Sequence, residues 1–525
     1  MNQFSSEGKD HKWGVLAVVI VGSFMAILDN NIVNVALPKM MAAFGATVDK
    51  IEWVVTGYMI AFAISMPTTN WLKDLIGLSK IFIFSMVFFC IGSALCGLAW
   101  DKDSLVVFRV LQAFGGGALM PTGMTLVSEA FPPEERGMAM GMWSIGAMVA
   151  PAAGPFVGGY LVDEVSWRSI FYINVPIGAA AALMALWILP KFRRAGAAKK
   201  PDIVGFLGFS AFLGFLLVAL AQGQREGWNS DYIVGCFSLS MVGLGVFLIS
   251  GFTVKEPIVD LRLFGNHNFL MASIINLVRA VAIFGSMFLM PLFLQNILDY
   301  KALHTGIILA PTAITVAVVS PFSGVISDRI GPRAPLFVGT LLVIYSLYMF
   351  KDLSLDSDYW FLFWPQVIRG AGMGLLNAPL MSAAVNAVRR EQISVASSLL
   401  TVNMQVGGAM GVALLGATLE RRQFFHYTQF LERINDLSVP VVAKAQAAME
   451  TLLARAGHAP ADFAVQGKTL LALWVQRQAA VGAFQDAFIL SALLITAGLV
   501  PALLIRNRKA LEAAAGPAPQ AVVSE

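Results

Sequence analysis

The first long apolar segment of the chain ends in the stretch Leu28-Asp29-Asn30-Asn31-Ile32-Val33-Asn34-Val35-Ala36-Leu37-Pro38. Asp29 follows Trp13, where that segment begins, by about 16 residues, or about 24 Å of helix. That depth lies inside a hydrocarbon core of about 30 Å, where a carboxylate costs a few kcal/mol or more. The cost predicts a functional role for Asp29, with a simple helix–helix contact as the alternative.

The composition of the chain excludes a soluble globular protein. Of its 525 residues, 57% are hydrophobic and only 13% are charged, and the mean hydropathy is +0.73. Its 47 glycines suit a membrane bundle, in which small residues let helices approach closely. Cys90, Cys96 and Cys236 all lie in apolar segments, so we expect neither a disulfide framework nor a metal site. The first apolar segment is too long for a signal-peptide core, so we expect it to remain in the mature protein.

Apolar runs of about twenty residues recur along the whole chain and predict an all-α polytopic membrane protein with about fourteen transmembrane helices. An even number of spans places both termini on one side. The predicted spans are 13–37, 51–71, 80–99, 104–128, 138–161, 169–190, 203–222, 232–253, 269–296, 304–326, 334–351, 359–386, 394–418 and 485–505.

The distribution of Lys and Arg predicts which side is cytoplasmic. Connections on one side of the membrane carry a single basic residue each: Lys50, Lys102, Arg168, Arg225, Lys301 and Lys351. The alternate set, which begins with the N-terminus, carries Lys9 and Lys12; Lys73 and Lys80; Arg136; Lys191, Arg193, Arg194, Lys199 and Lys200; Lys255 and Arg262; Arg329 and Arg333; Arg389 and Arg390; and Arg506, Arg508 and Lys509. By the positive-inside rule, both termini lie in the cytoplasm and the protein in the inner membrane.

Two pairs of segments indicate an internal repeat. Asn70-Trp71-Leu72-Lys73-Asp74-Leu75-Ile76-Gly77 matches Gly324-Val325-Ile326-Ser327-Asp328-Arg329-Ile330-Gly331 in the positions of Asp and the final Gly. Arg109-Val110-Leu111-Gln112-Ala113-Phe114-Gly115 aligns with Gln366-Val367-Ile368-Arg369-Gly370-Ala371-Gly372 at nearly the same offset. Two related halves around a central cavity are typical of transporters.

The repeat predicts two six-helix halves separated by two inserted helices. We expect a cytoplasmic N-terminus at 1–12, an N-terminal half at 13–190, a linker with the inserted helices at 191–253, a C-terminal half at 254–505, and a disordered cytoplasmic tail at 506–525. Within the C-terminal half, residues 420–484 form a long outward-facing connection with a helical, amphipathic pattern. That connection is either a solvated cap or a docking surface for a partner outside the inner membrane.

Arg109 is the expected partner of Asp29. It lies about 6 Å below the outer boundary of its helix, at nearly the depth that Asp29 reaches from the other side. Burial and a nearby cation move the pKa of a carboxylate in opposite directions, so a ligand that changes this balance can release a proton. We therefore predict proton coupling by Asp29 and Arg109, with a static buried ion pair as the alternative.

Further polar residues in the spans are expected to line the substrate cavity. They are Asn30, Asn34, Gln112, Arg279, Arg369, Asn377 and Asn403. The two asparagines of the first helix share one face and either line the cavity or bond neighbouring helices. With one deep carboxylate and several cations, the cavity suits lipophilic anions, neutral molecules or monocations better than dications. Alternatively, Arg279 and Arg369 snorkel or bond backbone carbonyls.

A third group of residues is expected to act in conformational gating. The run from Ala150 to Gly159 contains two prolines and three glycines, which favour bending or sliding of a helix. The aspartates of the repeated loops either form salt bridges with Arg136 or Arg389 or interact with helix N-terminal dipoles, unless they are merely solvated. The predicted gating residues are Asp74, Gly77, Gly154, Pro155, Gly158, Gly159, Asp328, Arg329 and Gly331.

Patterns typical of an enzyme or an ATP-driven pump do not occur in the sequence. Gly115-Gly116-Gly117 has no following Lys and lies in a membrane span, so it is no phosphate-binding loop. No His/Cys cluster has metal-ligand spacing, and no Ser/His/Asp set is visible. We therefore expect no catalytic residues, no metal, no cofactor and no nucleic-acid partner, only lipids, protons and a small lipophilic substrate, with an ion gradient as the energy source.

These motifs resemble those of the major facilitator superfamily, and specifically its fourteen-helix drug:proton antiporters of the EmrB/QacA group. The first-helix stretch, the loops with Asp74/Gly77 and Asp328/Gly331, the Arg109/Gln112/Gly115 motif and the fifth-helix Gly154-Pro155 with Gly158-Gly159 all resemble motifs of that group. So do Trp167-Arg168-Ser169-Ile170-Phe171-Tyr172-Ile173-Asn174-Val175-Pro176-Ile177-Gly178 and Pro257-Ile258-Val259-Asp260-Leu261-Arg262-Leu263-Phe264. The sequence departs from the usual pattern at Asn30-Asn31, Asn70 and Leu75.

The resemblance implies a proton-coupled antiporter that exports lipophilic toxic compounds by alternating access. EmrB-like pumps act with a periplasmic adaptor and an outer-membrane channel, so such partners are implied here too. The alternatives are a dedicated exporter of a fatty acid, lipid or siderophore-like metabolite, an uptake symporter, and a membrane receptor or scaffold that transports nothing.

Overall fold

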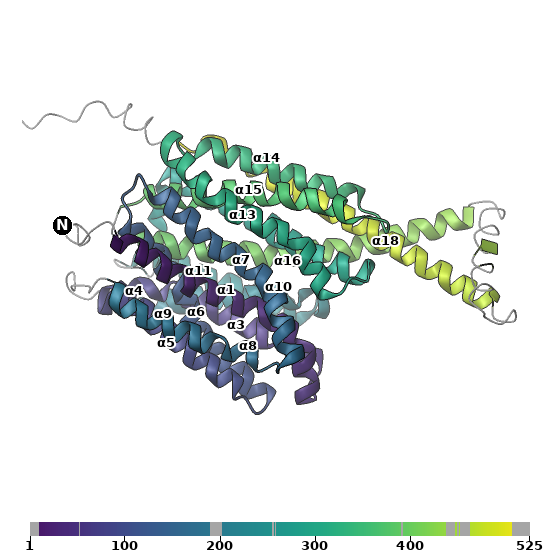
Figure 1. Ribbon diagram of the computed structural model, residues 1–525, viewed down its shortest axis with the longest axis horizontal. Helices are drawn as coiled ribbons and strands as arrows, with labels where there is room; N and C mark the ends of the chain where they lie inside the picture. The colour runs from purple at the N-terminus through teal and green to yellow at the C-terminus, as the bar shows by residue number, and fades with distance from the viewer. Residues whose placement is uncertain are drawn as a thin grey trace, which may run out of the picture.

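The structure is a computed structural model that describes residues 10–51, 53–189, 202–254, 257, 259–389, 392–436, 447–448, 451 and 463–506. All regular elements in these ranges are helices, and most run side by side along the long axis of the molecule (Figure 1). The expected all-α fold is therefore confirmed. The polar groups of the candidate site lie on helices of this bundle.

The helices follow the predicted spans in order. The first nine are α1 (Asp10–Phe44), α2 (Val48–Ile51), α3 (Trp53–Ser65), α4 (Thr68–Ile76), α5 (Leu78–Gly97), α6 (Lys102–Ala130), α7 (Arg136–Glu164), α8 (Ser169–Tyr172) and α9 (Asn174–Ile188). Two more are α10 (Ile203–Glu226) and α11 (Asp231–Thr253). The remainder are η1 (Leu261–Gly265), α12 (His267–Leu292), η2 (Phe293–Ile297), α13 (Ala302–Ile330), α14 (Arg333–Met349), η3 (Phe350–Asp352), α15 (Tyr359–Asn386), α16 (Ile393–Asp436), α18 (Phe463–Thr496) and α19 (Leu499–Leu504).

Eleven helices in the described ranges are long and apolar enough to cross a membrane. The predicted span 51–71 is not among them because the helix breaks near Pro67, which leaves the separate helices α3 and α4. The spans predicted at 138–161 and 359–386 correspond to α7 and α15, which are 29 and 28 residues long and are also not among the eleven. A total of fourteen spans therefore remains a prediction.

The packing of glycines repeats between the two predicted halves. Gly77 after α4 and Gly331 after α13 both have a positive φ, 89° and 94°, which a residue with a side chain rarely adopts. Gly115 in α6 lies against the backbone of α5, where an added Cβ would be 2.6 Å from the Phe89 nitrogen. Gly372 in α15 lies in the same way against α14, at 2.8 Å from the Gly339 oxygen. The proposed repeat is thus visible in backbone conformation and in helix packing.

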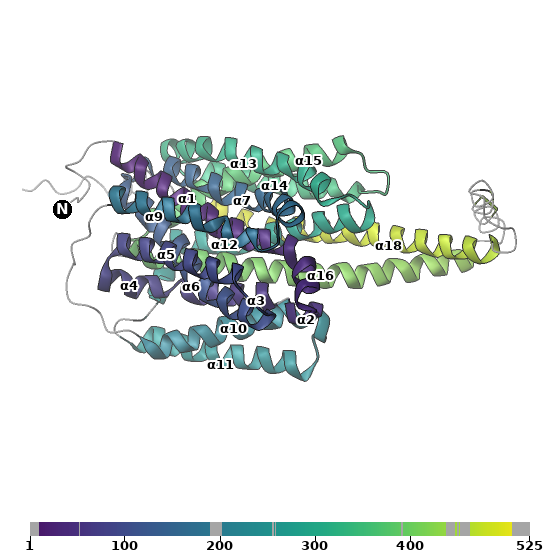
Figure 2. The same ribbon diagram turned by 60° about the horizontal axis from the view of Figure 1, so that its bottom comes forward.

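The two halves meet mainly where α7 packs along α13, as both views show (Figures 1 and 2). A Cβ added to Gly324 of α13 would lie 2.1 Å from the backbone oxygen of Gly137 in α7. In addition, α15 contacts α7, and α16 contacts α6 and α4. The inserted pair α10 and α11 lies at the edge of the bundle, with α10 against α3 and α16 (Figure 2).

The beginning of α1 and the end of α19 lie on the same face of the bundle. A continuous series of contacts on that face connects them: Lys12 with Glu135, Arg136 Nη1 with Asn386 Oδ1 at 2.8 Å, Asn266 Nδ2 with the Ala387 oxygen at 2.7 Å, and His267 Nε2 with the Leu504 oxygen at 3.0 Å. We call this the terminal face. It agrees with the even number of spans that the sequence predicts.

At the opposite end, α16 and α18 continue together beyond the rest of the bundle as a two-helix stalk (Figures 1 and 2). The predicted helical pattern of 420–484 is confirmed up to Asp436 and again from Phe463. Most of the connection between Asp436 and Phe463 lies outside the described residues.

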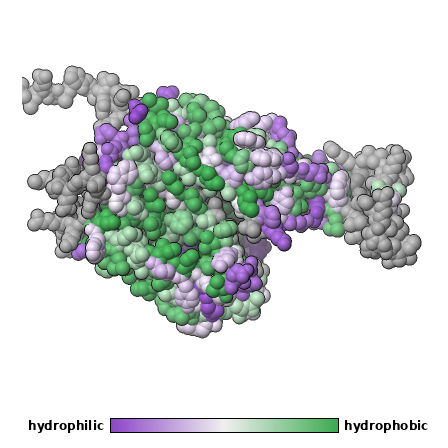
Figure 3. All heavy atoms as spheres, viewed as in Figure 1, coloured by the Kyte–Doolittle hydropathy of each residue, from purple (hydrophilic) through white to green (hydrophobic). Residues whose placement is uncertain are grey.

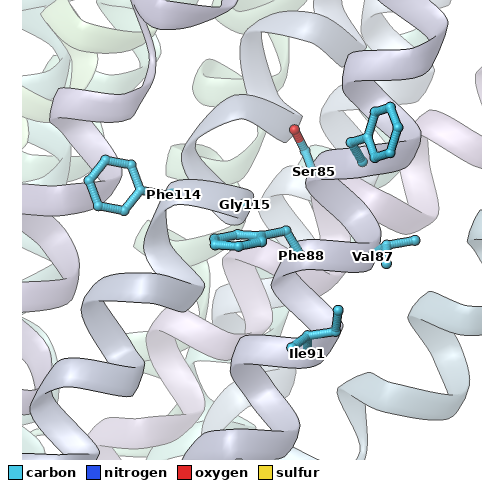
Figure 4. Close-up of a pocket in the computed structure, with 7 residues that line it drawn as sticks. Ser85, Val87, Phe88, Ile91, Phe114 and Gly115 are labelled. Atoms are coloured by element: carbon cyan, nitrogen blue, oxygen red, sulfur yellow. The ribbon is translucent and has the colours of Figure 1, made fainter.

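The sides of the bundle are apolar. Hydrophobic residues cover most of the body on the face drawn in Figure 3, and hydrophilic residues gather toward the ends. Large apolar side chains point outward, and Trp187, for example, is 87% exposed. A hollow of about 330 Å³ on this apolar surface lies between α5 and α6 (Figure 4), lined by Phe84, Ser85, Val87, Phe88, Ile91, Phe114 and Gly115. Its lining is almost entirely apolar, and none of the predicted cavity residues is part of it.

Candidate functional site

Asp29 is fully buried in α1 and accepts hydrogen bonds from three side chains. Its Oδ2 accepts from Arg109 Nη1 at 2.5 Å. Its Oδ1 accepts from Gln112 Nε2 at 3.1 Å and from Asn174 Nδ2 at 2.8 Å. The carboxylate is therefore held on both oxygens by groups from α6 and α9.

Arg109 and Gln112 are also fully buried, one helical turn apart on α6. The guanidinium donates to Gln112 Oε1 at 2.8 Å and to the Val54 carbonyl at 3.4 Å, and its carbon lies 3.9 Å from the ring centre of Tyr58. Within the described residues, Arg109 Nη2 and the Tyr58 hydroxyl have no hydrogen-bond partner. The cation is therefore almost entirely satisfied by α1, α3 and α6.

A capping box fixes the start of α6 and so the depth of Arg109. The Ser104 backbone N–H donates to Asp101 Oδ1 at 2.7 Å, and the Ser104 hydroxyl is in contact with the Asp101 backbone. The hydrogen bond from the Ser104 backbone lowers the pKa of the Asp101 carboxyl, which lies outside the apolar span. The helix thus begins in a defined register, with Arg109 two turns inside.

Asn174 and Tyr58 are members of this cluster that the sequence reasoning missed as site residues. Asn174, the first residue of α9, also donates to Ser93 Oγ at 3.1 Å. A usable signal existed, because Asn174 is the only polar side chain in the segment that forms α9. No comparable signal marks Tyr58, whose role depends on the packing of α3 against α6.

Asp29 and Arg109 are the two charged groups of the cluster. The carboxylate and the guanidinium form a buried neutral pair. Removal of either charge would leave the other buried and uncompensated, which costs about 3–5 kcal/mol. The structure thus brings Asp29 and Arg109 into contact, and the sequence had placed them at similar depths in the membrane.

The asparagines of the first helix lie apart from this cluster. Asn34 is exposed, and Asn30 is half-buried with an Oδ1 that has no partner among the described residues. Asn31 Nδ2 donates to the Ile27 carbonyl at 2.7 Å, which satisfies it within α1 itself.

Polar residues of the C-terminal half form two separate groups. Arg279 in α12 donates through Nη1 to Asn377 Oδ1 and through Nη2 to Asn276 Oδ1 at 3.0 Å. Asn403 Nδ2 donates to the Ser273 carbonyl at 3.0 Å. Asn276 was not predicted.

Arg369 belongs to the second group. It donates to Gln366 Oε1, which also accepts from Thr312 Oγ1 at 2.7 Å. Arg369 and Asn377 are about 12 Å apart along α15, so the structure does not unite the two cations in one cluster.

Asp328 joins the two halves at the terminal face. Its carboxylate oxygens accept from the backbone N–H groups of Gly137 and Met138, each at 3.0 Å, at the N-terminus of α7. Of the three alternatives that the sequence left open for Asp328, this is the one at a helix N-terminus. Arg329 is exposed, and the side chains of Asp74 and Pro155 lie outside what the structure describes.

The predicted gating glycines of α7 have different surroundings. A Cβ added to Gly154 would lie 3.0 Å from Asn31 Cβ, and one added to Gly158 would lie 2.7 Å from Ile32 Cγ1. A Cβ added to Gly159 would meet nothing within 4 Å. Gly154 and Gly158 therefore permit the close contact of α7 with α1, whereas Gly159 makes none.

Because only Gly158 is in tight contact with α1, substitutions at Gly158 and Gly159 should have different effects. Gly158→Leu should lower the thermal unfolding midpoint of the purified protein and reduce transport severalfold, because overpacking costs about 1–3 kcal/mol. Gly159→Leu, the matched control, should leave both unchanged. Equal effects of the two substitutions would show that the α1–α7 contact does not limit side-chain size at Gly158.

A family model for the Major Facilitator Superfamily matches residues 19–412. The chain belongs to the Major Facilitator Superfamily. Members of this superfamily are transporters rather than enzymes, and together with the apolar helices this makes the chain a multi-pass membrane protein. The resemblance found in the sequence motifs is therefore confirmed. Within the described residues, no group of three or more His, Cys, Asp or Glu side chains is arranged to hold a metal ion.

Named relatives and a solved structure agree with this assignment. The chain is 31% identical to the colistin resistance protein EmrB of Acinetobacter baumannii, over 81% of this chain and 86% of the relative. It is 33% identical to the fatty acid resistance protein FarB of Neisseria gonorrhoeae, over 79% and 82%. The human organic anion transporter MFSD10 shares the fold, with a TM-score of 0.59 at 12% identity, over 93% of this chain and all of that one.

Proposed function

We propose that this transporter is a proton-coupled antiporter that exports lipophilic toxic compounds from the cell. The observation that carries the proposal is the buried pair of Asp29 and Arg109, held by Gln112 and Asn174. Relatives named for resistance to colistin and to fatty acids support export of toxic amphiphiles. No cofactor is needed for this mechanism, because the proton gradient supplies the energy.

In the proposed cycle, Asp29 takes a proton from the outer side and substrate leaves. The protein then changes to its inward-facing state, in which Asp29 releases the proton to the cytoplasm as a new substrate binds. Arg109 acts on this proton exchange through its ion pair with the Asp29 carboxylate. In this cycle, binding of substrate and binding of a proton at Asp29 thus exclude each other.

Contacts at the terminal face support alternating access between the two halves. Asp328 bonds the N-terminus of α7, and Thr69 Oγ1 contacts Ser398 Oγ at 3.2 Å between α4 and α16. In the proposed cycle these bonds hold the cytoplasmic side closed and must break in the inward-facing state. The remaining cavity and gating residues, apart from Gly159, are proposed to act as the sequence predicts.

The proposed orientation places the protein in the inner membrane, with the terminal face in the cytoplasm and the stalk in the periplasm. The excess of Lys and Arg on connections of the terminal face supports it. We propose that the stalk of α16 and α18 contacts a periplasmic adaptor, which leads to an outer-membrane channel.

Everted membrane vesicles test the proposed function directly. With a proton gradient imposed, vesicles that contain the protein should accumulate a lipophilic fluorescent dye or drug, and collapse of the gradient should release it. Vesicles without the protein are the control. Accumulation that ignores the gradient would reject proton coupling, and accumulation only when the gradient is reversed would indicate a symporter.

Export of one metabolite is the second candidate, and the fatty acid resistance protein FarB among the relatives favours it. A strain that lacks the protein separates the two. Broad sensitivity to lipophilic toxins is expected for a drug exporter, whereas sensitivity to fatty acids alone would favour the metabolite exporter.

A further inference from the structure

Arg279 is a buried guanidinium without a carboxylate. Its side chain is only 5% exposed, in the middle of α12. Among the described residues it forms no ion pair, and its two oxygen partners, on Asn377 and Asn276, are neutral amides. Taking an unpaired charge out of water is costly, so this arrangement is stabilised best when an anion is present.

Two unpartnered donors lie together at this site. Arg279 Nε and Asn377 Nδ2 are buried and have no hydrogen-bond partner in the described part of the chain. They belong to two side chains that are already in contact, because Arg279 Nη1 donates to Asn377 Oδ1. A carboxylate has two oxygens and about four lone-pair sites, which is enough to accept from both donors at once.

The position of Arg279 in the fold suits a ligand that moves between the halves. Its guanidinium contacts Asn377 on α15 and the Met404 sulfur on α16, at 3.9 Å. Both of these helices pack against the N-terminal half, α15 on α7 and α16 on α6. The guanidinium therefore contacts two helices that also contact the N-terminal half.

Two buried arginines, Arg109 in one half and Arg279 in the other, differ in their partners. Arg109 is neutralised by Asp29 of its own half, at 2.5 Å. The carboxylates with ion pairs in the described C-terminal half bind other residues, Asp486 with Arg422 and Asp299 with Arg477. Among the described residues no carboxylate pairs with Arg279, so an anionic ligand can supply its counter-ion.

We propose that Arg279 and Asn377 form a binding site for the carboxylate of a lipophilic monoanion. The substrate class of the exporter then includes long-chain carboxylates. Asn276 is a positioning residue, because it holds Arg279 through Oδ1 and anchors itself on the Leu400 carbonyl at 2.8 Å. This inference rests on the proposed function, which supplies the transport of a lipophilic ligand.

Binding of dodecanoate and of dodecan-1-ol to the purified protein at pH 8 tests the site. The two probes have equal chain length and differ in the charge of the head group. Wild-type protein should bind dodecanoate about tenfold more tightly, as expected for a charge-assisted hydrogen bond in a buried site. Equal affinity for both probes would overturn the proposal without any variant.

Two variants locate the effect. Arg279→Gln removes the cation, and Asn377→Asp places a carboxylate of the protein beside it; each should abolish the preference for dodecanoate and leave the affinity for dodecan-1-ol within about twofold. Arg477→Gln is the matched control, since it removes one positive charge from an exposed ion pair. It should retain the preference. A preference that survives in both Arg279→Gln and Asn377→Asp would overturn the site.

Failure of the proposed anion site can be distinguished from failure of the proposed function. If vesicles show no gradient-driven accumulation of any lipophilic compound, the proposed function fails. If they do accumulate such compounds and the wild-type protein shows no preference for the carboxylate, only the anion site fails. Thermal unfolding of each variant verifies that it is folded before binding is measured.

Discussion

Asp29→Asn is expected to reduce gradient-driven efflux to the background of membranes without the protein. The variant keeps the size of the side chain and one oxygen for Arg109, but it cannot take or release a proton. With that oxygen on Arg109, its amide nitrogen faces both Gln112 Nε2 and Asn174 Nδ2, which donate to the same carboxylate oxygen in the wild type. Efflux of a fluorescent substrate from everted vesicles, normalised to the amount of protein in the membrane, measures the loss.

The control for this prediction must separate lost function from lost folding. Breaking a buried pair by removing one charge costs about 3–5 kcal/mol, because the remaining charge is uncompensated. The double variant Asp29→Asn/Arg109→Gln removes both charges and should regain thermal stability without regaining efflux. Undiminished efflux by Asp29→Asn would remove Asp29 from the mechanism.

Gly324→Leu is expected to abolish transport by separating the two halves at the terminal face. A Cβ there would lie 2.1 Å from the Gly137 oxygen and 2.7 Å from the Met138 nitrogen, and both are backbone atoms of α7. Overpacking of this kind costs about 1–3 kcal/mol, which changes the ratio of two conformations by about 5- to 150-fold. The state in which α7 and α13 are closed should therefore be depopulated.

Labelling of an introduced cysteine measures this opening. Because the native cysteines Cys90, Cys96 and Cys236 are buried, Met138→Cys can report on the terminal face through a membrane-impermeant maleimide. Labelling in everted vesicles should increase in the presence of Gly324→Leu and stay unchanged with Gly306→Leu. Gly306 lies on the same helix, and a Cβ there meets nothing within 4 Å. Equal labelling and transport in both variants would contradict the role of the α7–α13 contact.

The sequence predicted the part of the site that depends on helical geometry alone. The rise of 1.5 Å per residue places Asp29 and Arg109 at similar depths from opposite ends, and the structure brings them into contact. Asn174 and Tyr58 join them through the packing of α9 and α3, which no spacing along the chain determines. Tertiary contacts of this kind require the structure and cannot be derived from residue spacing.

The same distinction holds for the fold. Hydropathy predicted the apolar spans, but it did not separate α3 from α4 at Pro67, because the apolar run continues across the break. It ended one span at 418, whereas α16 continues without a break to Asp436 because that stretch contains no proline to end it. The predicted halves rest on short motifs, and the matching positive φ of Gly77 and Gly331 gives them a structural basis.

Proton release on substrate binding tests the central claim most directly. A compound that the vesicle assay identifies as exported is added to purified protein in weakly buffered solution with a pH indicator. The account predicts that wild-type protein releases protons on binding and that Asp29→Asn binds the same compound without release. Equal proton release by both proteins, or none by the wild type at saturating substrate, would contradict proton exchange at Asp29.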